Sequence, residues 1–173
     1  MRLTTIPPLL AAAALALVPA GCGSDDDTDA SPGGTTGGPG ATSGTVTVTA
    51  AEYSFDGLPD TLDAGETTFE LVNEGQEVHE LIVYRRNDGT TQPVEELLTL
   101  PDDQVLELVT PVTTVEQFTA LPSETATGAV DLDPGDYIAL CFVPVGLTDF
   151  ESEPPAGAAP HAAHGMVAEF TVR

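Results

Sequence analysis

Short stretches in which apolar and polar residues alternate, separated by turn-forming residues, follow one another from Thr45 to the end of the chain. Alternation with a period of two places the apolar side chains of each stretch on one face of a β-strand. The pattern predicts at least six strands, at residues 45–55, 66–72, 78–86, 127–132, 135–143 and 166–172. So many short strands with turns between them favour an all-β domain, built as a Greek-key β-sandwich.

The first predicted strand contains a break in its alternation. Val46 and Val48 share one face, but the next large residues, Tyr53 and Phe55, fall out of phase with them. A β-bulge near Ala51 would return both aromatic side chains to the core face, and we therefore predict one there.

The stretch "LDPGDYIALC" places Tyr137 just after a Pro-Gly turn and at the start of a core strand. This arrangement resembles a tyrosine corner, in which the phenol bonds back to the backbone at a Greek-key crossover. The alternative is an ordinary, half-buried strand tyrosine.

Residues 92–121 break the strand pattern. The segments "PVEELLTL" and "DDQVLELV" have helical spacing of their apolar residues. Pro93 is suited to open one helix and Asp102 to cap another. We predict a small helical insertion packed on one end of the sandwich.

The N-terminal region differs in composition from the rest. Residues 9–18 are apolar or small, too few to span a bilayer, and "VPAGC" follows them. This resembles a bacterial lipoprotein signal, although Pro19 stands where leucine is usual. The resemblance implies a signal peptide at residues 1–21, lipidation of Cys22 and a position on the extracytoplasmic face of the cell membrane. An ordinary secretory signal and an uncleaved anchor are the alternatives.

Residues 22–44 contain almost no apolar side chains after Cys22, and Gly, Ser, Thr, Pro and Asp dominate. Such a segment buries too little surface to offset the entropy of ordering, so we predict a flexible tether. The folded domain is then expected at residues 45–173.

The chain carries 28 acidic residues and only four basic ones, for a formal net charge of −24. This charge argues against binding to nucleic acids or to anionic lipid surfaces. It is consistent with docking on a basic redox partner protein. The alternative is that the acidic side chains only keep the surface solvated.

The chain has two cysteines, and lipidation of Cys22 would leave Cys141 without a disulfide partner. A free thiol in an exported protein points either to metal ligation or to inert burial.

His79 and Met166 each fall on the apolar face of a predicted strand, near its beginning, whereas Cys141 comes near the end of one. Because antiparallel neighbours bring the end of one strand beside the beginning of another, these three side chains can meet at one pole of the sandwich. Taken singly, an inward His or Met is more often an ordinary core residue.

His79, one imidazole of "PHAAHGM", Cys141 and Met166 together offer one thiolate, two imidazoles and one thioether. This soft donor set suits copper, and zinc would also accept it. The order of His79, Cys141, His161 and Met166 resembles that of the cupredoxins, the small blue-copper proteins. The resemblance covers residues 45–173, and implies one type 1 copper ion held by these four residues.

Two features depart from the cupredoxin pattern. Cys141 and His161 lie 20 positions apart, a longer separation than in the small blue-copper proteins, and a loose loop would weaken or open the site. His164 is the second departure, because it offers an alternative ligand, a supporting or docking residue, or an exposed side chain. We expect His161 to be the ligand. Asn73 and Glu80 are candidates for orienting the imidazoles.

These observations predict a membrane-anchored protein that transfers single electrons through copper. The alternatives are copper storage or delivery without redox cycling, and a metal-free cupredoxin-like module that binds a partner. We do not expect an enzyme, because four protein ligands leave no position for a substrate and the sequence shows no nucleophile–base motif.

Overall fold

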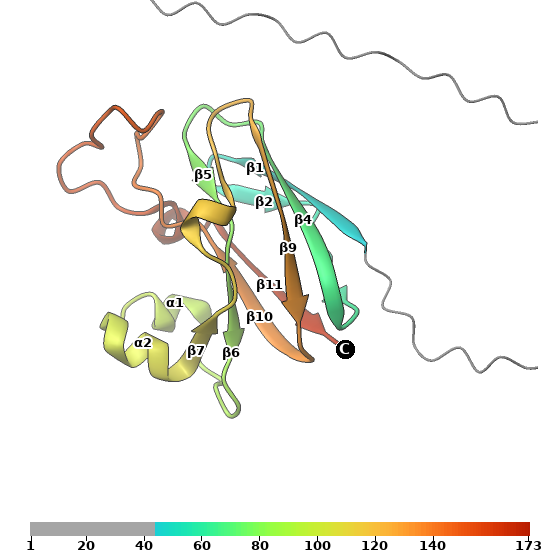
Figure 1. The fold of residues 1–173 in the computed structure, drawn as a ribbon. Helices are drawn as coiled ribbons and strands as arrows, with labels where there is room; N and C mark the ends of the chain where they lie inside the picture. The colour runs from blue at the N-terminus through green and yellow to red at the C-terminus, as the bar shows by residue number, and fades with distance from the viewer. Residues whose placement is uncertain (1–43) are drawn as a thin grey trace, which may run out of the picture. The chain divides into compact units, whose positions relative to one another are not determined.

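The computed structural model describes residues 44–173. The strands of this part of the chain form two larger, facing sheets and one two-stranded sheet (Figure 1). The longer elements are β1 (Thr45–Ala51), β2 (Ser54–Asp56), β4 (Gly65–Asn73), β6 (Ile82–Arg86), β9 (Thr125–Leu132), β10 (Gly135–Leu140) and β11 (Val167–Val172). Shorter ones are β3 (Thr61–Leu62), β5 (His79–Glu80), β7 (Val109–Pro111) and β8 (Thr119–Ala120).

One large sheet has the order β2-β1-β4-β9, the second has the order β3-β11-β10-β6-β7, and β5 and β8 form the two-stranded sheet. Most neighbours are antiparallel, but β1 runs parallel to β4 and β3 parallel to β11. The chain passes repeatedly between the sheets, for example from β4 to β6 and from β9 to β10, as in Greek-key topologies. The predicted all-β sandwich is confirmed.

The prediction of a bulge near Ala51 is wrong. β1 and β2 form a hairpin, in which Ala51 pairs with Ser54 and only Glu52 and Tyr53 lie between the strands. The reversal of direction accounts for the change of phase, because Tyr53 and Phe55 belong to the turn and to the returning strand. Both pack against the core, as the prediction required. The hairpin also places Glu52 at the tip of the turn.

The predicted helical insertion is present as α1 (Val94–Leu97), α2 (Asp102–Leu108) and the 3₁₀ turn η1 (Val115–Gln117). Pro93 directly precedes α1, as expected, but Asp102 is the first residue of α2 and makes no side-chain cap. The insertion covers the outer face of the second sheet rather than one end of the sandwich. Its apolar residues cluster with the outward-facing side chains of β10. The members of this cluster include Val94, Leu97, Val109, Ile138 and Leu140.

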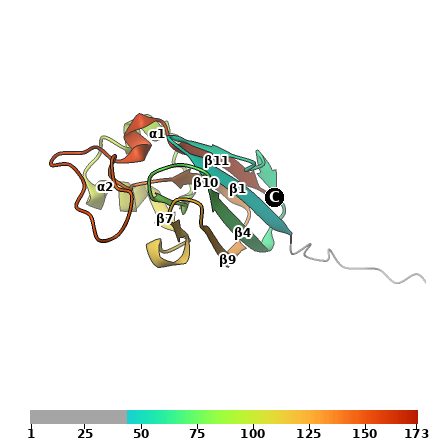
Figure 2. The same cartoon turned by 90° about the horizontal axis from the view of Figure 1, so that it is seen from above.

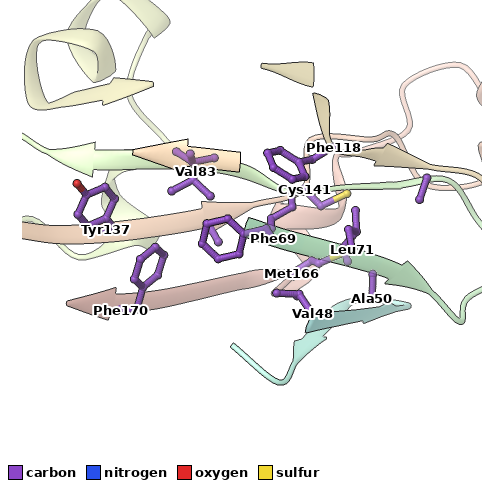
Figure 3. Close-up of a cluster of buried hydrophobic side chains, with 14 of the residues drawn as sticks. Val48, Ala50, Phe69, Leu71, Val83, Phe118, Tyr137, Cys141, Met166 and Phe170 are labelled. Carbon is purple, nitrogen blue, oxygen red and sulfur yellow. The ribbon is translucent and has the colours of Figure 1, made fainter. Parts of the chain in front are cut away.

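The main core lies between the two sheets (Figure 3). At one end of it, Tyr137 stacks on Phe170 with ring centroids 5.1 Å apart. The Tyr137 hydroxyl donates a hydrogen bond of 2.7 Å to the carbonyl of Asp133. The predicted tyrosine corner is therefore confirmed, and this end of the core has its polar group satisfied.

The predicted signal peptide, the lipidation site at Cys22 and nearly all of the predicted tether lie outside the described residues. Among residues 44–173, none of the helices has the length and hydrophobicity needed to cross a bilayer.

Candidate metal centre

Three buried side chains from distant parts of the chain meet at the end of the core opposite Tyr137. Nδ1 of His79 and Nδ1 of His161 are 3.2 Å apart, and the Cys141 sulfur lies 3.3 Å from the His161 nitrogen and 4.0 Å from the His79 nitrogen. Each of the three residues has an exposure of 0%. Within residues 44–173, this is the one group of three or more His, Cys, Asp or Glu side chains placed to share a metal ion.

The strand register explains why Cys141 reaches this point. The last residue of β10, Leu140, pairs with Ile82 at the beginning of β6 and with Val167 at the beginning of β11. The next residue, Cys141, therefore emerges beside the beginnings of two strands, as the alternation predicted. The Cys141 amide donates to the carbonyl of Met166, just before β11.

His79 is placed by a different pairing from the one expected. The predicted strand 78–86 is divided into β5 and β6, which belong to different sheets. His79 pairs with Ala120 on β8, at the far end of the helical insertion, and the Leu81 amide then bonds to the Phe118 carbonyl. The insertion thus contributes to the site, because its last strand holds His79 in place.

His161 begins the 3₁₀ turn η2 (His161–His164), and the chain after Cys141 positions it. The His161 amide donates to the Val143 carbonyl at 2.9 Å, and the Ala162 amide donates to the Cys141 carbonyl at 2.8 Å. An isolated bridge between Pro144 and Pro160 closes the base of the loop. The long 142–160 loop therefore does not loosen the ligand positions, although it projects beyond the sheets in both views (Figures 1 and 2).

Carboxylates face the outer nitrogens of both imidazoles. Nε2 of His161 lies 2.9 Å from a Glu77 carboxylate oxygen, at hydrogen-bond distance. Nε2 of His79 lies 3.8 Å from a Glu52 oxygen, too far for a hydrogen bond, and has no hydrogen-bond partner in the structure. The sequence offered Asn73 and Glu80 for these positions instead.

Asn73 and Glu80 perform other tasks. The Asn73 amide donates to the carbonyls of Glu77 and Ala120 and accepts from the Gly75 amide, so it fixes the backbone before β5. Glu80 accepts a 2.8 Å bond from the Phe142 amide, which links the segments that follow His79 and Cys141. Burial raises the pKa of Glu80, although this bond opposes the rise.

Backbone amides hold the two outer carboxylates. One oxygen of Glu52 accepts from the amides of Gln76 and Glu77, and one oxygen of Glu77 accepts from the Gly146 amide at 2.6 Å. Burial raises the pKa of Glu52, but these backbone bonds outweigh it and leave the pKa below its usual value. An ionised carboxylate favours the N–H tautomer at the imidazole nitrogen that faces it.

With its Nε2 hydrogen directed to Glu77, His161 presents the Nδ1 lone pair to the interior, and the same tautomer of His79 would present a second one. A thiol proton on Cys141 can satisfy only one of them. Burial raises the pKa of this thiol to about 12 and lowers the pKa of His79, a shift to which the neighbouring His161 also contributes. In that state at least one lone pair of the centre has no partner, an arrangement that is costly unless a cation completes it.

The spacing of the donors suits one metal ion. Nitrogen and sulfur ligands lie about 2.0–2.3 Å from such an ion, so three in one plane lie about 3.5–3.8 Å apart. The observed separations of 3.2–4.0 Å surround that range. The residues present thus fit a metal bound by one thiolate and two imidazoles.

Met166 is buried, with an exposure of 0%, and belongs to the same core cluster as Cys141 (Figure 3). It lies directly before β11, and its amide donates to the His161 carbonyl at 3.2 Å. The expectation that it points inward is met. Its backbone is tied to both Cys141 and His161, which suits a weak fourth ligand.

His164 lies outside the cluster and is exposed, although only three positions separate it from His161. Its ring packs 5.0 Å from that of Tyr53, which also contacts His161 at 5.0 Å. Gly165, at φ +100°, ends the η2 turn and directs the chain inward to Met166. His164 therefore covers Tyr53 from outside.

Neither a protein-family model nor a curated protein matches the chain. Among solved structures, it is similar to dithionite-reduced auracyanin from Roseiflexus castenholzii, with 20% identity, a TM-score of 0.48, and coverage of 78% of this chain and 99% of that one. Auracyanin A, described as a "blue" copper protein from Chloroflexus aurantiacus, gives 18% identity, a TM-score of 0.41, and coverage of 75% and 99%. A multicopper oxidase gives 14% identity, a TM-score of 0.42, and coverage of 75% of this chain and 41% of that one.

Proposed function

We propose that this chain is a cupredoxin-type protein that transfers single electrons through one type 1 copper ion. His79, Cys141 and His161 would bind the metal, with Met166 as a weaker fourth ligand. The observation that carries the proposal is the convergence of two imidazole nitrogens and one thiol sulfur, from residues that are all fully buried, at a spacing that suits a single ion. A soft set of this kind selects copper over harder cations.

The protein's contribution is to fix the donors before the metal arrives. β5 and β8 hold His79, the end of β10 holds Cys141, and the backbone bonds at the base of the 142–160 loop hold His161. When bound, copper would accept and release one electron by changing between its two oxidation states. Because rigid donors keep one geometry in both states, little rearrangement accompanies that change. This rigidity favours electron transfer over storage or delivery, which require the ligands to open.

Burial serves the same function. Apolar side chains of the core surround Cys141 and Met166 and exclude water from the sulfur atoms. The carboxylates of Glu52 and Glu77 add negative charge outside the imidazoles, which stabilises a cation in the otherwise apolar surroundings. Four protein donors leave no position for a substrate, so we propose a carrier rather than an enzyme.

We further propose that the domain is anchored through lipidated Cys22 to the extracytoplasmic face of a bacterial membrane, with residues 22–44 as a tether. The sequence pattern supports this, together with a free, buried thiol that an oxidising compartment would leave intact only in a protected site. The charge of −24 supports a basic redox partner protein and argues against nucleic acids.

Addition of Cu(II) to the purified domain, followed by visible spectroscopy, tests the proposed site. We expect one equivalent to bind and to produce the intense blue colour of thiolate-to-copper charge transfer. Met166→Leu should keep the colour and shift mainly the reduction potential, because Met166 would be only a weak fourth ligand. Binding without the blue band would favour storage or delivery, and a thiol that is freely alkylated in the presence of copper would contradict a metal function.

A further inference from the structure

A shallow apolar hollow of about 520 Å³ lies at the surface, between η1 and the first part of the 142–160 loop. Four large hydrophobic side chains are exposed in residues 44–173, and three of them, Val115, Phe142 and Phe150, line this hollow. Phe150 is 65% exposed and Val115 is 53% exposed. Exposed apolar side chains that gather at one place, aromatic ones among them, are typical of an interaction surface.

The hollow adjoins the candidate metal centre through the chain itself. Val78, which lines it, is bonded to His79, and Phe142, which also lines it, is bonded to Cys141. Glu80 lines the hollow as well, and its bond to the Phe142 amide connects the two ligand segments. Two of the three ligands are thus one residue away from this surface, which gives an electron a short covalent route.

A route through an exposed imidazole edge is closed in this protein. His79 and His161 both have an exposure of 0%. Nε2 of His161 is occupied by Glu77, Tyr53 packs against the ring, and His164 packs against Tyr53 in turn. An electron therefore has to enter through other side chains, and those of the hollow are bonded to the ligands.

Phe150 is held outward by its own turn. The Asp149 carboxylate accepts from the amides of Glu151 and Ser152, at 2.8 and 2.7 Å, and from the Ser152 hydroxyl at 2.9 Å. The bonds from Ser152 and Glu151 lower the pKa of Asp149, so this carboxylate is charged at neutral pH. The turn presents an aromatic ring beside a fixed negative charge.

The charge around the hollow indicates the kind of partner. Glu116 lines it, and Asp149, Glu151 and Glu153 flank Phe150 in the sequence. The basic side chains of residues 44–173 are Arg85, Arg86 and Arg173, at the ends of β6 and β11 that lie away from the metal centre. A second copy of this chain would bring the same negative charges together, whereas a basic rim would complement them.

We propose that the hollow formed by Val115, Phe142 and Phe150 is the docking surface for a redox protein with an apolar centre and a rim of Lys or Arg. The inference rests on the proposed electron transfer and specifies where it occurs. In the electron-transfer step, the partner protein loses one electron and this protein gains one, and no bond is formed or broken. The small hollow suits a transient complex that must dissociate after each transfer.

Commercial cytochrome c, a basic haem protein, serves as the probe. Its affinity for the domain is measured by calorimetry at low salt, and electron transfer from its reduced form to the copper-loaded domain by stopped flow. Ferricyanide oxidation of the reduced domain shows whether the metal site itself has changed. The test variant is Phe150→Ser, and the matched control is Leu106→Ser. Leu106 is 56% exposed and lines a second apolar hollow, beneath α1 and α2, which shares only Phe142 with the proposed surface.

We expect Phe150→Ser to weaken binding and slow transfer by about tenfold, the effect of losing one central aromatic contact, with the ferricyanide rate unchanged. Leu106→Ser should change neither by more than about twofold. Equal effects of the two variants, or an effect of Leu106→Ser alone, would overturn the proposed surface. A concentration-dependent dimer that Phe150→Ser abolishes would also overturn it, in favour of a second copy. The binding measurement needs no copper, so it separates the two proposals. If the protein forms no blue band with copper, but Phe150→Ser still weakens its binding to cytochrome c, the proposed function is contradicted and the docking surface is supported.

Discussion

At one end of the sandwich Tyr137 is buried with its hydroxyl bonded to the backbone, whereas at the other end His79, Cys141 and His161 are buried with their inner nitrogens facing one another. Both ends lie in the same core cluster or directly beside it, and both are sealed from water. The first end is complete as the chain folds. The second brings together a thiol and two imidazole nitrogens that face only one another.

This difference separates a structural polar residue from a functional one. A buried polar group that serves the fold finds its partner within the chain, as Tyr137 does. A buried group that serves a ligand is left with an open lone pair, and the rest of the structure holds it in that state. In this protein Glu77 lies at hydrogen-bond distance from the outer nitrogen of His161, and Glu52 faces the outer nitrogen of His79 from 3.8 Å.

The largest change should follow replacement of the thiol. Cys141→Ser removes the soft donor but keeps the shape of the side chain, so the fold should persist. We expect the blue colour to vanish and copper affinity to fall by more than about 100-fold, since loss of an outer partner alone costs about 10–100-fold. Copper titration with visible spectroscopy and circular dichroism measures both. A blue band that survives the substitution would contradict thiolate ligation.

The two histidines of η2 offer the next comparison. His161→Ala removes a buried donor, and we expect about a 100-fold loss of copper affinity and loss of the blue band. His164→Ala, three positions away, removes an exposed ring and should alter affinity by less than about threefold. Competition titration against a chelator of known affinity measures the difference. Equal losses in the two variants would contradict the assignment of His161.

Glu77 tests the effect of the outer carboxylate. Glu77→Gln keeps a hydrogen-bond acceptor for His161 but removes the negative charge, so copper affinity should fall by about tenfold. The reduction potential should rise, because the lost charge stabilised the more positive oxidised state. The matched control is Glu74→Gln, at an exposed position three residues earlier. Voltammetry that showed no difference between the two variants would contradict a role for Glu77 at the metal.

The raised pKa of Cys141 predicts two opposite pH dependences. Copper binding must release the thiol proton, so between about pH 7 and 9 affinity should rise about tenfold per pH unit. In the metal-free protein, the folded thiol ionises only near 12, whereas the ordinary value is 9.0. A pKa raised on folding stabilises the protein at lower pH and ceases to do so as pH climbs toward the folded value, so metal-free stability should fall above about pH 9.

Cys141→Ser provides the control for both pH dependences, because it has no thiol to ionise. Denaturant unfolding and metal competition at several pH values measure them. A metal-free protein that gained stability between pH 9 and 11, or a variant that kept the same slopes, would rule out Cys141 as the titrating group.

The smallest effect should come from the completed end of the core. Tyr137→Phe removes one hydrogen bond and leaves the ring stacked on Phe170, so the free energy of unfolding should fall by about 1 kcal/mol. Copper affinity and colour should stay unchanged, because this end makes no contact with the site. A change in the spectrum of this variant would show that the two ends are coupled.

Much of this arrangement was predictable because alternation with a period of two fixes which face each side chain occupies. That rule placed His79 and Met166 inward, and strand order placed Cys141 beside them. The unbroken apolar run at residues 137–141 also carried a signal that was not used, since a strand buried on both faces loses its alternation. The cover supplied by α1 and α2 accounts for that run.

Other features depend on contacts that no local pattern contains. The parallel pairing of β1 with β4 joins segments about 23 positions apart, and nothing in either segment specifies direction. Glu52 reaches the centre only because the chain reverses at that point, where the change of phase indicated a bulge. Glu77 lies two positions before His79, so proximity could have suggested it, but not its bond to His161.

X-ray absorption spectroscopy of the copper-loaded protein tests the central claim most directly, because it reports the atoms bound to the metal. We expect one short copper–sulfur bond and two copper–imidazole bonds in the wild type, with the sulfur signal absent from Cys141→Ser. A metal bound only by oxygen and nitrogen atoms, with Cys141 still a protonated thiol, would contradict the account.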